Sequence, residues 1–276
     1  MTVNDRGRSE NAASDAGGNI PRGPILLADL TSDATAALRD QVELVLIPIG
    51  AHEQHGPALP VSTDTLSVQV LCSLVGTLMR PRVAVAPAIP WGSSWAHLDR
   101  PGTISLRSET LISLVVDIVD SLSRNGFRKF MLVNGHGGNN AALRIASEHC
   151  RALENAPIVV PVYSYSLVSV AGSELLGSTA PGHGGGDEAS LILSIRPDLV
   201  QRNALQNPVA NEKLVVMAQI LGAVNGTLPT AQSSYSAVGT TGDASGASAE
   251  AGKAILAQVT NQLRAIIEQL LETDIP

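Results

Sequence analysis

Aromatic residues are scarce in this chain of 276 residues, where Phe, Trp and Tyr together make up 3%. Hydrophobic residues still account for 44% of the sequence, so a sizeable core can form, but Ala, Val, Leu and Ile must build most of it. Cysteine is rarer still. Cys72 and Cys150 give neither a Cys-x-x-Cys metal motif nor a disulfide framework, so we expect two reduced core residues.

An excess of positive charge is also missing. The chain has 18 Lys and Arg against 25 Asp and Glu, and the formal net charge of −7 argues against a nucleic-acid partner, because phosphate binding requires basic residues. No run of about 18 apolar residues is present, so we expect no membrane span and no membrane partner. The first residues lack the apolar segment of a secretory signal, which makes a cytoplasmic location the expectation.

The chain divides into a polar N-terminal segment and one long region of mixed apolar patterns. Residues 1–23 are rich in Gly, Ser, Asn and charge, which predicts a disordered tail, and residues 24–276 are predicted to form a single domain. In this domain, short apolar runs alternate with stretches of helical periodicity, which is the pattern of an α/β fold with a mainly parallel sheet. The expected strands are residues 44–49, 83–89, 129–133 and 158–162. The expected helices are residues 30–40, 65–79, 108–126, 141–153, 188–195 and 249–273.

Other segments have weaker patterns. Residues 164–169 are expected to continue from the fourth strand into a loop, and residues 213–226 have no assigned structure. Residues 227–248 are rich in Gly, Ser, Thr and Ala and are expected to wrap the surface of the domain or a neighbouring subunit. Helix caps are expected at Ser32 or Asp33 and at Ser108.

Polar side chains follow the first predicted strand at the point where it ends. Glu53 and His55 are two residues apart, so in extended chain both point to the same side, and Asp64 follows after a loop stiffened by prolines. In open α/β sheets, ligands bind beyond the carboxyl ends of the strands. Asp64 is expected at the start of a helix, where the helix dipole favours a carboxylate.

Two further polar clusters follow other apolar segments. His136 lies in the glycine-rich sequence NGHGGNN, and His183 and Glu188 lie in GHGGGDEAS. Imidazole and carboxylate together suit Zn²⁺, Mn²⁺ or Fe²⁺, and Asp64 is placed to bridge two ions. The same residues also allow plainer interpretations: hydrogen-bonded structural histidines, a helix cap at Asp64, or an ordinary Asn-Gly turn. A phosphate-binding loop is disfavoured because neither GxGxxG nor GxxxxGK[ST] is present.

Four segments, in order, resemble the creatininase (creatinine amidohydrolase) family: GAHEQHGPALPVSTD at residues 50–64, HLDRPGTISL at 97–106, NGHGGNN at 134–140 and GHGGGDEASL at 182–191. The resemblance covers residues 29–200. It implies a three-layer α-β-α fold, a dinuclear metal centre, hydrolysis of C–N bonds other than ordinary peptide bonds, and a homo-oligomer, often a hexamer.

The resemblance also implies site residues. Glu53, Asp64 and His136 would hold one metal, and His55 and Asp64 the other, with Asp64 bridging. Creatininase itself has a glutamate where this chain has Gly138, and Glu188 is the expected replacement, as a metal ligand and catalytic residue. The other implied roles are catalysis for His183, which matches a family histidine near the substrate, and substrate binding for His97, Asn139 and Trp95.

The function expected from the resemblance is a metal-dependent amidohydrolase. Two divalent ions, zinc, manganese or iron, would hold a bridging hydroxide that attacks an amide, cyclic amide or formamide carbon, while His183 passes a proton to the leaving nitrogen. The positions of the creatinine-sandwiching tryptophans match Ser166 and a residue near Thr179, so we expect a substrate other than creatinine.

Three further possibilities stay open from the sequence. Some family members deformylate a pyrimidine nucleotide precursor, and others cleave a ribosomally made precursor peptide of the cofactor mycofactocin. The third possibility is a family member that has lost catalysis and serves as a binding or assembly protein. A small amide or a short peptide is therefore the expected partner.

Overall fold

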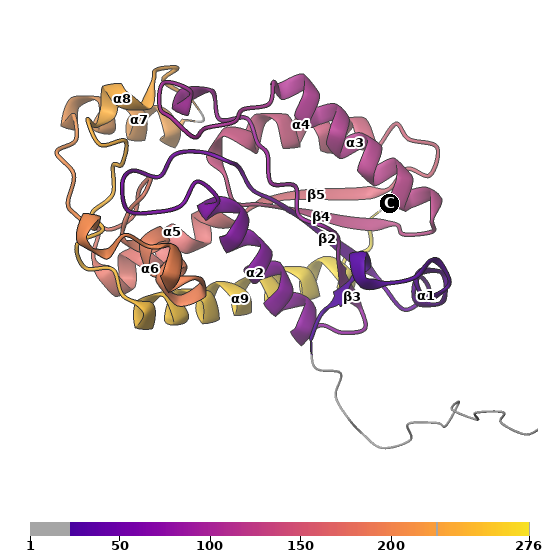
Figure 1. Ribbon diagram of the computed structural model, residues 1–276. Coiled ribbons are helices and arrows are strands. Elements are labelled where there is room, and N and C mark those ends of the chain that lie inside the picture. The colour runs from indigo at the N-terminus through magenta and orange to yellow at the C-terminus, as the bar shows by residue number, and fades with distance from the viewer. Residues whose placement is uncertain (1–22, 225, 276) are drawn as a thin grey trace, which may run out of the picture.

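A five-stranded parallel sheet forms the centre of the protein, for which a computed structural model describes residues 23–224 and 226–275 (Figure 1). The spatial order is β1-β3-β2-β4-β5, and each neighbouring pair is parallel. The strands are β1 (Ile25–Leu26), β2 (Leu44–Ile49), β3 (Val83–Val85), β4 (Lys129–Asn134) and β5 (Ile158–Tyr163). The predicted α/β class is confirmed, while the predicted tail, except Gly23, lies outside the described residues.

Helices cover both faces of the sheet (Figure 1). The helices are α1 (Ser32–Leu38), α2 (Thr63–Leu78), α3 (Ser108–Arg124), α4 (Asn140–Cys150), α5 (Ser164–Leu176), α6 (Gly186–Ile195), α7 (Glu212–Ala223), α8 (Gln232–Tyr235) and α9 (Ala249–Glu272). Short 3-10 turns, such as Trp95–His97 and Gly137–Asn139, connect them. In the part of the chain that the structure describes, no helix is long and apolar enough to cross a membrane.

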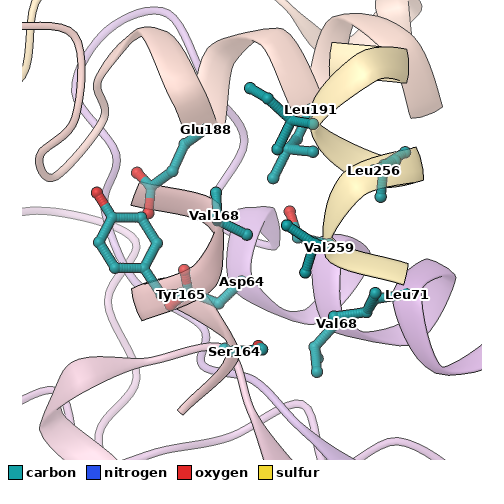
Figure 2. A pocket seen from close by; sticks show the side chains of 13 residues that line it. Asp64, Val68, Leu71, Ser164, Tyr165, Val168, Glu188, Leu191, Leu256 and Val259 are labelled. Carbon is teal, nitrogen blue, oxygen red and sulfur yellow. The ribbon is translucent and has the colours of Figure 1, made fainter. Parts of the chain in front are cut away.

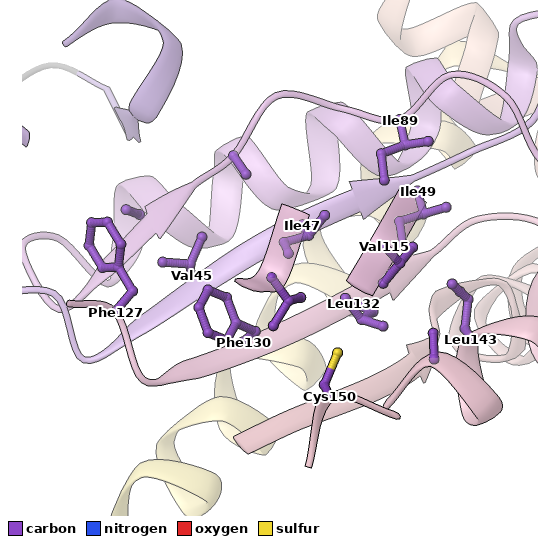
Figure 3. Close-up of a cluster of buried hydrophobic side chains, with 14 of the residues drawn as sticks. Val45, Ile47, Ile49, Ile89, Val115, Phe127, Phe130, Leu132, Leu143 and Cys150 are labelled. Carbon is purple, nitrogen blue, oxygen red and sulfur yellow. The ribbon is translucent and has the colours of Figure 1, made fainter. Parts of the chain in front are cut away.

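Alternation along the strands divides the core into two layers. Val45, Ile47 and Ile49 of β2 face α3 and α4, together with Phe130 and Leu132 of β4 (Figure 3). The intervening residues of β2 and β4 face α2, α5, α6 and α9. Every residue of β2 is buried, as expected for a central strand covered on both faces, and burial of each large side chain stabilises the fold by about 1.5–3 kcal/mol.

Several expected boundaries are wrong. Residues 164–169 form the start of α5 rather than a loop, because Val168 and Ala171 are buried against the core, which overrides the modest helix propensity of Ser and Val. Helix α1 is capped by Thr31, whose side chain accepts a hydrogen bond from Ala34 N at 3.2 Å, and not by Ser32 or Asp33. Ser108 is the first helical residue of α3 instead of its cap.

The carboxyl ends of three neighbouring strands meet at one edge of the sheet. Ile49 of β2 is in register with Asn134 of β4, and Asn134 is in register with Tyr163 of β5. The loops that leave these ends therefore carry their side chains into one region. This is the edge at which the sequence predicted the candidate site.

Candidate metal centre

Two carboxylates and one imidazole form the first group of possible ligands. His136 Nδ1 lies 3.2 Å from Glu53 Oε1 and 3.3 Å from Asp64 Oδ2. One donor atom from each of these three buried residues lies within 4.8 Å of the other two, a spacing that suits a single cation. They come from the loop after β2, the first turn of α2 and the loop after β4, as the sequence predicts.

A second group lies beside the first. His55 Nε2 is 3.2 Å from Asp64 Oδ1 and 3.6 Å from Glu188 Oε2. Donor atoms of His55, His183 and Glu188 also lie within 4.8 Å of one another. Asp64 therefore presents one carboxylate oxygen to each group, which is the arrangement expected of a bridging ligand.

Hydrogen bonds to backbone carbonyls fix the orientation of the two histidines next to Asp64. His55 Nδ1 donates to Glu53 O at 3.0 Å, and His136 Nε2 donates to Ser93 O at 3.1 Å. The other ring nitrogen of each histidine points at carboxylates. Supporting bonds of this kind are usual for metal-binding histidines, since they set the tautomer of the ring.

Three buried donor atoms at the centre have no hydrogen bond among the described residues: Glu53 Oε2, His55 Nε2 and Asp64 Oδ2. Leaving a buried polar atom unpaired costs about 1–3 kcal/mol, and more when the group is charged. One divalent cation between Glu53 and Asp64 and a second beside His55 would satisfy these atoms. The residues present therefore fit a metal centre.

The electrostatics of the centre agree with this interpretation. Burial alone would lower the pKa of His55, but the charges of Asp64 and Glu188 outweigh it and raise that pKa to about 10. Burial likewise opposes charge on His136, yet Glu53 and Asp64 raise its pKa well above the ordinary value. The neighbouring carboxylates thus favour a positive charge at both rings, as the ligands of a bound cation would.

Glu188 is held in place by the loop before α6. Its Oε2 accepts a hydrogen bond of 2.7 Å from the N–H of Gly184. The backbone of Gly184 has a φ of +64°, a left-handed conformation that favours glycine. Burial raises the pKa of Glu188 to about 8. Figure 2 shows Glu188, Tyr165 and Asp64 at one side of a narrow cavity of about 20 Å³, with Val68, Leu191 and Val259 on its apolar side.

His183 lies among the other imidazoles. Its ring centroid is 4.3 Å from those of His55 and His97, its Nε2 donates to Gln54 O at 2.6 Å, and its Nδ1 lies 3.7 Å from Glu53 Oε1. Burial and the neighbouring His55 lower its pKa well below the ordinary value. This position suits either an acid–base group or a further ligand, so its catalytic role stays a prediction.

A cavity of about 200 Å³ opens onto the centre. It is lined by the predicted residues Glu53, Asp64, His97, His136, His183 and Glu188, by the glycines at 135, 137 and 138, and by Tyr163 and Tyr165. His97 lines this cavity with its Nε2 3.7 Å from Glu53 Oε1, and its contact with substrate stays a prediction.

Two residues predicted to bind substrate lie elsewhere. Asn139 is completely buried, and its amide accepts from Ser93 N at 2.8 Å and donates to Gly50 O at 3.0 Å, so it ties three loops together beneath the cavity. Trp95 is 57% exposed and does not line the cavity. Neither placement supports direct contact with a substrate.

Gly138 marks the position at which creatininase itself carries a glutamate. A Cβ atom at this position would overlap Ser93 O and the ring of His136. The local backbone of this protein therefore leaves no room for a side chain there, and the replacement of that carboxylate by Glu188 stays a prediction.

Sequence reasoning missed Gln54 and the two tyrosines. The Gln54 amide nitrogen lies 3.0 Å from His97 Nδ1 and donates to Gly239 O at 2.9 Å, so it orients His97 and holds the 236–243 segment over the site. That segment also contacts the loop that carries His183, since Thr241 N donates to His183 O at 2.8 Å.

Tyr163 directly follows the predicted fourth strand. The rule that ligands bind beyond the carboxyl ends of strands, which indicated Glu53, would also have indicated Tyr163.

The fold and the site define an α/β protein with a carboxylate–histidine centre of the kind that binds divalent metals. The sequence matches the family model "Creatininase: Creatinine amidohydrolase" over residues 28–267, and the chain belongs to this family. The resemblance expected from the four motifs is thus confirmed.

Individual relatives agree with the family assignment. The mycofactocin precursor peptide peptidase of Mycobacterium ulcerans is 30% identical over 243 residues, which cover 86% of this chain and 89% of the relative. A crystal structure of creatinine amidohydrolase superposes with a TM-score of 0.73 at 25% identity, covering 91% of this chain and 99% of the other. A mutant creatininase described as of Zn-Zn type gives a TM-score of 0.72 at 25% identity, with the same coverage.

Proposed function

We propose that this protein is a metal-dependent amidohydrolase that cleaves a C–N bond of a small amide, cyclic amide, formamide or short peptide. The observation that carries the proposal is the set of three buried, unpaired donor atoms on Glu53, His55 and Asp64, of which Glu53 and Asp64 line an open cavity. Zinc is the first metal to test, because a structurally similar creatininase is described as a Zn-Zn form. Manganese and iron are the alternatives that the same donor set would accept.

In this proposal, Glu53, Asp64 and His136 hold one ion and His55, Asp64 and Glu188 hold the other. When bound, such ions make hydroxide available at neutral pH and polarise a carbonyl group. The side chains around them keep the reacting atoms in a small buried space. His183 Nδ1 faces Glu53 and carries no proton while Nε2 donates to Gln54 O, so it takes a proton as water adds to the carbonyl carbon and passes that proton to the leaving nitrogen as the C–N bond breaks.

A precursor-peptide peptidase is the second candidate function. It is favoured by the relative from Mycobacterium ulcerans, whose similarity extends over most of both chains. The two candidate functions, amidohydrolase and precursor-peptide peptidase, differ in substrate and use the same proposed metal centre. A mycofactocin-type precursor peptide therefore belongs in the substrate panel beside creatinine, other cyclic amides and formamides.

The proposal is tested by metal removal and reloading. Chelator-treated protein is reloaded with Zn²⁺, Mn²⁺ or Fe²⁺, and hydrolysis of each panel member is followed by mass spectrometry. We expect turnover of at least one amide or peptide, little or none of creatinine, and none in the metal-free sample. Binding of two ions without any turnover would contradict an enzymatic function and favour a binding or assembly role.

Asp64 provides a test of the centre that needs no substrate. Because one oxygen of Asp64 faces each ligand group, Asp64→Ala should lose both ions, which mass spectrometry of the metals would measure. Full metal occupancy in this variant would show that the bridging assignment is wrong. Circular dichroism of the variant separates loss of metal from loss of fold.

A further inference from the structure

Tyr163 lies at the edge of the sheet where the candidate centre is built. It is the last residue of β5, and its register partner in β4 is Asn134, two residues before His136. Its side chain lines the 200 Å³ cavity. None of the motifs found in the sequence contains this residue.

The hydroxyl of Tyr163 packs on the bare backbone next to a predicted metal ligand. A Cβ atom at Gly137 would lie 3.0 Å from Tyr163 Oη and 3.7 Å from Cζ. Gly137 directly follows His136, so the phenol reaches the wall of the cavity beside the centre because residue 137 has no side chain. The glycine and the tyrosine are complementary in shape.

The Tyr163 hydroxyl has no hydrogen bond among the described residues, although its backbone carbonyl accepts one from Ser166. The neighbouring Tyr165 differs, since its hydroxyl accepts from Gly182 N at 2.9 Å. Burial, followed by the charges of Glu188, Asp64 and Glu53, raises the pKa of Tyr163, so the phenol keeps its proton. A protonated donor without a partner therefore faces the cavity.

The chemistry of the cavity indicates what this donor binds. Apart from Tyr165, whose hydroxyl already accepts a hydrogen bond from Gly182 N, the other polar side chains that line the cavity are carboxylates and imidazoles. Addition of water to an amide carbon forms a C–O bond and moves the carbonyl electron pair onto oxygen, which then needs a donor. When the C–N bond breaks, the electron pair on the oxygen re-forms the C=O bond, and the leaving nitrogen takes from His183 the proton that the added water has lost.

We propose that the Tyr163 hydroxyl donates a hydrogen bond to the carbonyl oxygen of the bond that is cleaved, and that it stabilises the negative charge developing there. Tyr163 is in this respect a catalytic residue that keeps its own proton throughout. The inference rests on the proposed amidohydrolase function. A purely structural tyrosine, filling the space left by Gly137, is the alternative that the experiment must exclude.

The kinetic test compares Tyr163→Phe with Tyr235→Phe in the metal-loaded enzyme. Phenylalanine keeps the aromatic ring beside Gly137 and removes only the hydroxyl, while Tyr235, at the end of α8, does not line the cavity. With the best substrate of the panel, we expect kcat of Tyr163→Phe to fall about 10²–10³-fold, with little change in KM or metal content. Unchanged kcat, or loss of metal, would overturn the inference.

A binding test works without any substrate. Inorganic phosphate, a tetrahedral oxyanion, is titrated calorimetrically into both metal-loaded variants and the wild-type protein. We expect Tyr163→Phe to weaken phosphate binding about tenfold and Tyr235→Phe to leave it unchanged, since one hydrogen bond to a charged group is lost. Equal affinity in all three proteins, or no binding by the wild type, would overturn the role of Tyr163. Absence of turnover in the wild type would instead count against the proposed function.

Discussion

At the scale of single residues, the candidate centre depends on three buried carboxylates, those of Glu53, Asp64 and Glu188. Of these carboxylates, Glu188 comes from the glycine-rich sequence GHGGGDEAS. Its neighbour Asp187 is also buried, but Asp187 Oδ1 accepts from Glu188 N at 2.9 Å and does not line the cavity. The two adjacent carboxylates therefore make a matched pair for mutation.

We predict that Glu188→Gln weakens binding of one metal ion by about 10- to 100-fold and leaves the other bound. The reason is that Glu188 faces His55 and not the group around His136. Asp187→Asn should keep both ions. Isothermal titration with Zn²⁺ measures both variants, and unchanged binding by Glu188→Gln would assign Glu188 to a structural role at the start of α6.

Metal affinity should also increase with pH. Below a pKa of about 10, His55 of the metal-free protein carries a proton, and binding of a metal must release it. His136 behaves in the same way, because its pKa is raised too. We expect the association constant to increase about tenfold per pH unit for each proton released. A competition assay with a chelator at about pH 6 and about pH 8 checks this, and pH-independent affinity would contradict it.

The residues that the sequence could predict are those that follow a strand directly. Glu53, His55 and His136 lie within a few residues of strands β2 and β4, so alternation and the strand-end rule suffice to bring them together. The contacts of Gln54 could not be predicted, because His97 and Gly239 reach it through long loops with no periodicity. The contacts of Asn139 could not be predicted for the same reason, since its partners Gly50 and Ser93 come from two other loops, and its role in substrate binding stays a prediction.

At the scale of secondary-structure elements, strands were easier to predict than helix contacts. The apolar run of β2 has the same bounds in the sequence and in the structure, whereas α5 was missed because its stabilisation comes from packing against α6 and α9. Helices α6 and α9 pack in close contact, because a Cβ atom at Gly252 of α9 would overlap the backbone oxygen of Ser190 in α6.

We therefore predict that Gly252→Ala destabilises the protein by about 1–3 kcal/mol, because α9 would have to move away from α6. In an exposed helix the same change is favourable, since alanine is the better helix former. Gly222 of α7 provides that control, as nothing lies within 4 Å of its Cβ position. Urea unfolding should show Gly222→Ala to be neutral or stabilised by up to about 1 kcal/mol. Equal stability of the two variants would contradict the close α6–α9 contact.

At the scale of the whole molecule, one apolar surface has no cover among the described residues. Helix α7 lies with α8 away from the sheet (Figure 1) and exposes Val216, Met217 and Ile220, each by 46% or more. Val209 before the helix and Val224 after it are 92% and 72% exposed. We call these five residues the α7 patch. Exposed apolar residues that gather on one element usually mark an interface.

We predict that a second copy of the chain covers the α7 patch and that the protein is a homo-oligomer in solution, which the sequence resemblance also led us to expect. A self-complementary contact buries the α7 patch of both copies, and each large apolar side chain removed from water contributes about 1.5–3 kcal/mol.

Analytical ultracentrifugation should show a mass above that of one chain for the wild type and a smaller species for Ile220→Glu. Leu78→Glu on α2, a residue 58% exposed outside the patch, is the matched control and should leave the mass unchanged. A monomeric wild type would contradict the oligomer itself, whereas dissociation by Leu78→Glu alone would place the interface on α2.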